Sequence, residues 1–155
     1  LDGFQGNFLQ FLHQLLGLLD IDEASGDDVR AGNDAAIITY GRMLDHALDA
    51  AELLTEQGIE VSVIRLLHAA PLPVDAVLNA IGDCRKVVIV EETAAGSGIR
   101  HELAAALREK NPGLEIGGMD LGSEFVTHGS VQELDKAYHL DGKSIAEYTK
   151  GVLQR

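Results

Sequence analysis

The residues best suited to chemistry lie in residues 87–98, where an apolar strand meets a glycine-rich turn. This run passes from four apolar residues through Glu91 and Glu92 to Gly96-Ser97-Gly98. Glycines at a strand–turn–helix junction let the backbone approach an anion, and a helix N-terminus favours negative charge. No Lys follows the glycines, however, and the two upstream carboxylates would repel a phosphate. Gly96, Ser97 and Gly98 are therefore candidates for an anion site, with a turn or a subunit contact as the favoured interpretation.

The two adjacent carboxylates do not fit a general acid/base pair. Successive side chains of a strand point to opposite faces, so Glu91 and Glu92 cannot share a proton or flank one substrate. At most one of them faces a site. A solvated or structural carboxylate is the favoured interpretation, and Glu92 is kept as a candidate for an interface or anion site.

The six histidines and the single cysteine carry no metal or nucleophile signature. None of the histidines occurs as H-x-x-x-H or H-E-x-x-H, and Cys84 has no second cysteine with which to bind a metal or form a disulfide. His68 and His128 lie in expected loops at strand ends, which makes them the candidate site histidines. We predict no metal site, no cofactor-binding residue and no catalytic residue in this chain alone.

Composition excludes several classes of partner. The 155 residues carry a net charge of −13, which argues against nucleic acid and against an anionic membrane surface, because both require a basic footprint. No stretch approaches the about 20 apolar residues of a membrane span. The lone cysteine fits a reducing cytoplasm.

Hydrophobic periodicity predicts the elements that position these residues. We expect buried strands at 35–40, 59–66, 86–91 and 114–119, and helices at 43–57, 74–81, 99–110, 130–138 and 144–153, the last two each opened by a Ser N-cap. Alternating strands and helices imply a three-layer αβα sandwich with a mostly parallel sheet of four to five strands. Residues 1–33 are expected to form a Leu-rich helix and an acidic loop or hairpin that link to a preceding domain, and residues 34–155 the α/β domain.

Three stretches, in this order, resemble the C-terminal domain of the transketolase-like thiamine-diphosphate enzymes. They are Ala36-Ile37-Ile38-Thr39-Tyr40-Gly41-Arg42-Met43, Val61-Ser62-Val63-Ile64-Arg65-Leu66-Leu67 with Pro71-Leu72-Pro73, and Val88-Ile89-Val90-Glu91-Glu92 with Gly96-Ser97-Gly98. The segments at 119–130 and 140–145 are similar to the deoxyxylulose-phosphate synthase group. The departures are His68-Ala69-Ala70, where those synthases usually have a Lys, and the missing Pro-Asp pair before Phe125.

The resemblance implies a parent transferase that uses thiamine diphosphate and Mg²⁺, and that joins pyruvate with glyceraldehyde 3-phosphate in isoprenoid precursor synthesis. In that family a G-D-G motif followed by an Asn binds the diphosphate and the metal. Gly26-Asp27-Asp28 and Gly82-Asp83-Cys84 come nearest to it here, and neither has the required continuation. The chain is therefore expected to be inactive alone and to bind no cofactor.

The implied partners are the remaining domains of the parent enzyme and a second copy in a cytoplasmic homodimer. The expected contacts are residues 1–19 and the turn at Gly96. Two alternatives stay open. One is a stand-alone regulatory module that binds an anion or nucleotide, and the other is the C-terminal domain of a 2-oxo acid dehydrogenase beta subunit.

Overall fold

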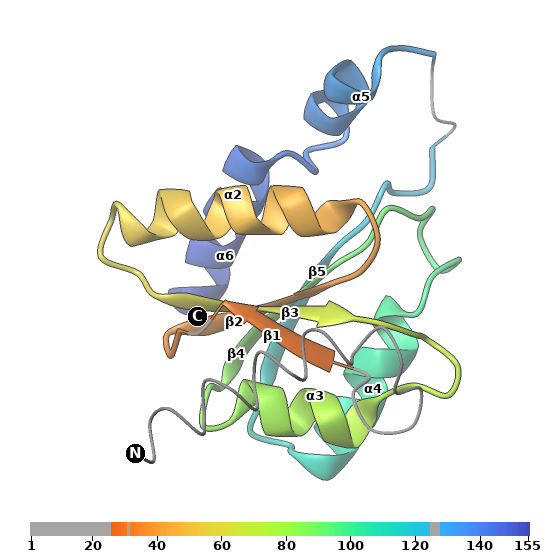
Figure 1. Cartoon of the computed structure of the whole chain (residues 1–155). Coiled ribbons are helices and arrows are strands. Elements are labelled where there is room, and N and C mark those ends of the chain that lie inside the picture. Colours follow the sequence, from red (N-terminus) through yellow and green to blue (C-terminus); the bar gives the residue numbers. More distant parts are fainter. Residues whose placement is uncertain (1–25, 31, 125–127) are drawn as a thin grey trace, which may run out of the picture.

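A five-stranded sheet organises the chain, as seen in a computed structural model that describes residues 26–30, 32–124 and 128–155 (Figure 1). The strands are β1 (Gly26–Arg30), β2 (Ala35–Thr39), β3 (Val61–Leu66), β4 (Lys86–Val90) and β5 (Glu115–Met119). Their order in the sheet is β1-β3-β2-β4-β5. Strands β2 to β5 pair in parallel, and β1 runs antiparallel to β3. The predicted αβα sandwich with a mostly parallel sheet is confirmed.

Helices cover both faces of the sheet, as the alternating pattern predicts. The helices are α2 (Met43–Thr55), α3 (Val74–Ile81), α4 (Arg100–Lys110), α5 (Val131–Ala137) and α6 (Gly142–Leu153). Figure 1 shows α2 and α6 on one face and α3 and α4 on the other. Among the helices of the described residues, none has the length and hydropathy needed to cross a membrane.

The period-two alternation of the central strands divides the core into two layers. Ala35 and Ile37 of β2 pack with α2 and α6, whereas Ala36 and Ile38 pack with α3 and α4. Strand β4 divides in the same way, and its four valine and isoleucine side chains are all fully buried. A strand that is buried on both faces reads as a continuous apolar run, which is why β2 and β4 were recognisable in the sequence.

One of the two predicted helix caps differs from the expectation. Helix α6 begins at Gly142 with Asp141 as its N-cap, and the Asp141 side chain accepts a hydrogen bond from the Ser144 N–H at 3.2 Å. The predicted Ser144 cap is therefore wrong, because Asp141 caps the helix three residues earlier. Ser130 does cap α5, in a reciprocal capping box with Glu133.

Strand β1 comes from the stretch that sequence analysis assigned to the linker. It completes the sheet by pairing with β3, with an irregularity in register between Asp28 and Arg30. The predicted helix in residues 1–19 lies outside the described residues, and the domain boundary at residue 34 stays a prediction.

Candidate functional site at the carboxyl ends of the strands

The sheet has its topological switch point between β2 and β4. From β2 the chain crosses to β3 on one side, whereas β4 and β5 lie on the other side. Loops that leave the carboxyl ends of such neighbours diverge, and open α/β sheets usually bind ligands in the resulting crevice. Tyr40 and Arg42 follow β2 at this point, and Glu91 and Glu92 follow β4.

Glu91 caps helix α4 from inside the domain. Its side chain is 1% exposed, and its Oε2 accepts hydrogen bonds from the backbone N–H groups of Ile99 at 3.0 Å and Arg100 at 3.1 Å. The Tyr40 hydroxyl donates a third hydrogen bond to the same oxygen at 3.0 Å. These are the N–H groups that an anion would use at a helix N-terminus. The carboxylate of Glu91 therefore occupies the helix N-terminus at which the sequence pattern indicated a possible anion site.

The position of the Glu91 carboxyl group leaves room only for glycine at residue 98. A Cβ atom on Gly98 would lie 2.3 Å from Glu91 Oε2 and 2.4 Å from its Cδ. Only a residue without a side chain fits so close to a buried carboxyl group. The glycine thus serves close packing within the domain.

Tyr40 is held as a neutral hydrogen-bond donor. Burial, the hydrogen bond to Glu91 and the negative charge of Glu91 together raise the pKa of Tyr40 to about 12. The phenol consequently remains protonated at neutral pH and is unsuited to act as a general base there.

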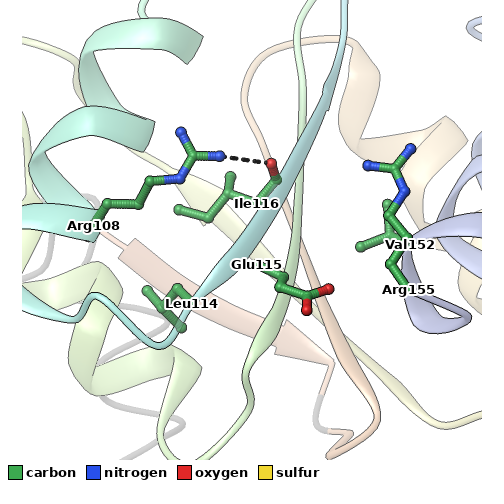
Figure 2. A pocket seen from close by; sticks show the side chains of 6 residues that line it. All are labelled: Arg108, Leu114, Glu115, Ile116, Val152 and Arg155. Atoms are coloured by element: carbon green, nitrogen blue, oxygen red, sulfur yellow. Dashed lines mark hydrogen bonds between the residues drawn. The ribbon is translucent and has the colours of Figure 1, made fainter.

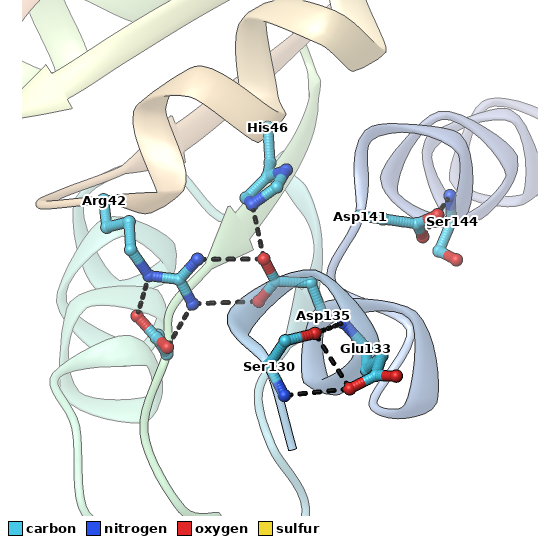
Figure 3. A network of polar contacts seen from close by, with 8 residues as sticks. Arg42, His46, Ser130, Glu133, Asp135, Asp141 and Ser144 are labelled. Atoms are coloured by element: carbon cyan, nitrogen blue, oxygen red, sulfur yellow. Dashed lines mark hydrogen bonds and ion pairs between the residues drawn. The ribbon is translucent and has the colours of Figure 1, made fainter.

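Arg42 closes the switch point from the other side of the β2 strand end (Figure 3). Its Nε donates to Glu92 Oε2 at 3.0 Å, and its Nη2 contacts Glu92 Oε1. The same guanidinium donates to Asp135 Oδ2 at 2.9 Å and to Oδ1 at 2.8 Å, and His46 Nε2 lies 2.9 Å from Asp135 Oδ2. One arginine therefore ties β2, β4 and α5 together.

The electrostatics of this cluster favour its ionised form. Asp135 is 5% exposed, and the bidentate hydrogen bonds from Arg42 lower the pKa of its carboxyl group against the opposing effect of burial. The hydrogen bonds to Asp135 and Glu92 in turn raise the pKa of Arg42. Glu92 is exposed, so its share of the pairing is screened by solvent.

The expectation that Glu91 and Glu92 serve different faces is confirmed. Glu91 is directed at α4, whereas Glu92 is directed at Arg42. The two adjacent carboxylates do not share a hydrogen-bond partner among the described residues.

The glycine-rich turn is exposed at its tip and anchored at its base. Gly96, with φ of +79°, and Ser97 are exposed. The Ala95 N–H donates to the Gly122 carbonyl at 2.8 Å, and the Thr93 carbonyl accepts from Leu121 N–H at 2.9 Å. The loops after β4 and β5 therefore support each other, and the turn presents a fixed surface.

The two candidate histidines lie apart from this network. His68 is partly buried in the β3–α3 loop, just before the cis Ala70-Pro71 bond, and His128 is exposed in the loop before α5. Within the described part of the chain, no hydrogen bond or ion pair links either histidine to Glu92 or to the turn at Gly96. The assignment of Glu92, Gly96, Ser97, Gly98, His68 and His128 to an interface or anion site stays a prediction.

Sequence reasoning missed Arg42, His46 and Asp135. Arg42 carried a signal, because it follows Gly41 directly at the end of a buried strand, where site residues concentrate. His46 and Asp135 carried no sequence signal of a role at this site. They lie on separate helices, and Asp135 is 93 positions from Arg42 in the sequence.

Comparison with known proteins identifies the family. The family described as "Transketolase, C-terminal domain" matches residues 25–145. The chain belongs to the transketolase C-terminal domain family. The resemblance inferred from the sequence motifs is thereby confirmed.

Relatives of this transketolase C-terminal domain include 1-deoxy-D-xylulose-5-phosphate synthases. The synthase of Halothermothrix orenii is 33% identical over 117 residues, which cover 75% of this chain and 18% of the relative. The acetoin:2,6-dichlorophenolindophenol oxidoreductase subunit beta of Cupriavidus necator is 33% identical over 98 residues, covering 63% of this chain and 28% of that protein. The chain therefore spans about a fifth of the length of the synthases it matches.

Solved structures support the fold of this transketolase C-terminal domain. A split-gene transketolase described as an inactive beta4 tetramer superposes with a TM-score of 0.74 at 23% identity, covering 88% of this chain and 44% of that chain. The likeness extends over nearly the whole sandwich. The strand end and turn that carried the sequence resemblance are the same residues that form the Glu91 cap on α4.

Proposed function

We propose that this chain is the non-catalytic C-terminal domain of a thiamine-diphosphate-dependent transferase of the 1-deoxy-D-xylulose-5-phosphate synthase type. The parent enzyme would join pyruvate and glyceraldehyde 3-phosphate in the cytoplasm, in the synthesis of isoprenoid precursors. The domain's part is to pack against the other domains and to extend a homodimer interface. The relatives among the synthases and the order of motifs along the chain support this assignment.

The observation that carries the non-catalytic role is the closed switch point. Arg42 bridges Glu92 at the end of β4 and Asp135 on α5, while Tyr40 and Glu91 pair beneath them. Each of these side chains already has at least one partner within the domain, although Glu91 Oε1 accepts no hydrogen bond from the described residues. A substrate could enter the crevice only by breaking contacts that stabilise the fold.

The residues present do not fit the family's cofactor. A diphosphate needs free N–H donors and a metal needs carboxylates with open coordination positions, but the N–H groups at the start of α4 bond to Glu91. Gly82-Asp83-Cys84 precedes β4 and so lies at the opposite, amino end of the strand. Thiamine diphosphate and Mg²⁺ therefore belong to other parts of the parent enzyme.

A surface poor in charge supports the packing role. The loops after β3 and β4 expose Leu67, which is 37% exposed, together with Ala94, Ala95 and Gly96. Beyond Glu92, these exposed residues are uncharged, in a chain whose net charge is −13. The hydrogen bonds from Ala95 to Gly122 and from Leu121 to Thr93 fix the part of this surface that follows β4.

Calorimetry tests the cofactor assignment. We expect the 155-residue chain to show no tight binding of thiamine diphosphate in the presence of Mg²⁺. Tight binding would overturn the proposal that this domain is non-catalytic. A thermal-shift screen of nucleotides and sugar phosphates separates the stand-alone alternative, which requires stabilisation by a millimolar ligand.

The packing role is tested in the full reading frame that contains this chain. Ala95→Glu places a charge and a longer side chain on the exposed turn, and we expect it to weaken dimerisation measured by light scattering. Gln57→Glu adds the same charge at an exposed position just after α2 and serves as the control. A dimer unaffected by Ala95→Glu would refute the assignment of this turn to the interface.

A beta-subunit domain is the second candidate, and the Cupriavidus necator relative favours it. The genomic reading frame decides between the two. A G-D-G motif followed by an Asn in the same frame supports the synthase type, whereas the same motif in a separately encoded partner supports the subunit type.

A further inference from the structure

Helix α5 is attached to the domain in a different way from the other helices, and Figure 1 shows it apart from the sheet. Helix α6 is anchored by apolar side chains such as Val152, which is 1% exposed and is drawn in Figure 2. Neither of the two described core layers includes a side chain of α5. Of its seven residues five are exposed and Leu134 is half-buried, so the one buried side chain is that of Asp135.

That buried side chain is held by charge. Arg42 donates from Nη1 to Asp135 Oδ2 at 2.9 Å and from Nη2 to Oδ1 at 2.8 Å, and His46 Nε2 lies 2.9 Å from Oδ2 (Figure 3). Both partners come from the segment where β2 passes into α2. Hydrogen bonds between ionised groups are the stronger kind, so this contact can hold a helix that buries no apolar side chain.

The remaining hydrogen bonds of α5 are local. Ser130 and Glu133 form the capping box at its start. At its end His139, with φ of +57°, donates its N–H to the Lys136 carbonyl at 3.2 Å, and the Leu140 N–H donates to the Asp135 carbonyl at 2.8 Å. This is a Schellman motif, which completes the helix from within the segment itself.

These local bonds cannot maintain the helix without the contact of Asp135. A helix of seven residues is too short to persist in water by itself. Directly after α5 the chain enters the core again at Leu140, which is 1% exposed. Loss of the Asp135 contact would therefore free α5 and leave the chain anchored from Leu140 onward.

We propose that α5 is a releasable strap over the switch point. Asp135 latches it to Arg42 and His46, and the helix opens by local unfolding while both core layers stay folded. Opening withdraws the buried carboxylate from Arg42 and leaves Glu92 as the acceptor of that guanidinium. The strap concerns how the switch point is closed, and it operates whichever parent enzyme carries the domain.

Native-state amide exchange of the 155-residue chain, followed by NMR at low concentrations of guanidinium chloride, tests the proposal. The amides of Leu134 and Tyr138 donate within α5 and report its opening, and those of Val88 and Ile89 in β4 report unfolding of the core. We expect the α5 amides to exchange at least tenfold faster and with little dependence on denaturant. Equal rates with equal denaturant slopes would overturn the proposal, because α5 would then open only with the whole domain.

A substitution identifies the latch. Asp135→Asn keeps the size of the side chain and removes its charge, so exchange at Leu134 and Tyr138 should become about tenfold faster or more. Cleavage by trypsin after Lys136, located by mass spectrometry, should rise in parallel. Glu52→Gln makes the same chemical change at an exposed position of α2 and should alter neither rate. Unchanged rates in Asp135→Asn, or equal increases in both variants, would refute the latch.

Discussion

Replacing Gly98 by alanine should destabilise the domain far more than a single methyl group normally does. The added Cβ would lie 2.3 Å from Glu91 Oε2 and 2.5 Å from Oε1, well inside contact distance. The carboxyl group has no free space to enter, because it is 1% exposed and is held by Ile99, Arg100 and Tyr40. Either the α4 N-terminus or the carboxylate must move.

The cost follows from the hydrogen bonds that this movement breaks. Three donors bond to Glu91 Oε2, and a buried hydrogen bond to a charged group contributes about 1.5–3 kcal/mol. Losing one or two of them predicts that the free energy of unfolding of Gly98→Ala falls by about 1.5–6 kcal/mol. That is a large part of the about 5–15 kcal/mol that stabilises a typical domain.

Guanidinium chloride unfolding followed by circular dichroism measures this loss. Gly151→Ala is the matched control, since Gly151 is helical and exposed and its Cβ would meet nothing within 4 Å. It should stabilise the domain by about 0.5–1 kcal/mol. In a Glu91→Ala background the Gly98→Ala cost should largely vanish. A loss below about 1 kcal/mol in the wild-type background, or the same loss in both backgrounds, would refute the reasoning.

Three further predictions concern the strand-end network and the helix caps. The phenol of Tyr40 should ionise near pH 12, and ultraviolet difference titration against Tyr40→Phe should show its absorbance change at that pH. The stability that the raised pKa contributes is complete below pH 10 and is lost between pH 10 and 12. The pKa of Asp135 in the folded domain is lowered from its usual 3.8, so the ionised carboxylate stabilises the fold fully above pH 3.8. This stabilisation is lost as the pH falls through the lowered pKa of the folded state. The acid unfolding of Asp135→Asn, followed by fluorescence, should therefore depend less steeply on pH in this range. Asp141→Ala should lower the free energy of unfolding by about 1 kcal/mol through loss of the α6 cap, which urea unfolding would detect, whereas Ser144→Ala should cost less.

The local signals in the sequence were sufficient for most of the fold. Apolar runs predicted β2 and β4 because both faces of these strands are buried, and the Ser130 cap was predicted from the serine itself. Strand β1 was missed because its five residues, Gly26–Arg30, contain no apolar run, and only its pairing with β3, more than 30 positions away, places it in the sheet. The α6 cap was misassigned because Asp141 and Ser144 are both good N-cap residues, and only the backbone conformation distinguishes them.

The candidate site was less predictable than the fold. The sequence correctly indicated that Glu91 and Glu92 have different roles, since this depends only on the alternation of a strand. It gave no means of finding the partner of Glu92, because Arg42 is 50 positions away and its second partner, Asp135, is 93 positions away. Side-chain pairing over such separations is set by how α2, α5 and the strand ends pack.

By itself, the sequence determined that residues 87–98 form a strand, two divergent carboxylates and a glycine turn, and that the chain carries the motifs of its family. Those properties depend on near neighbours and on periodicity. Only the tertiary structure decided that the anion-binding end of α4 is filled by Glu91 and that the switch point is closed by Arg42. The physical reason is that a helix N-terminus binds whichever negative group packing brings to it, and in this domain packing brings a carboxylate of the chain itself.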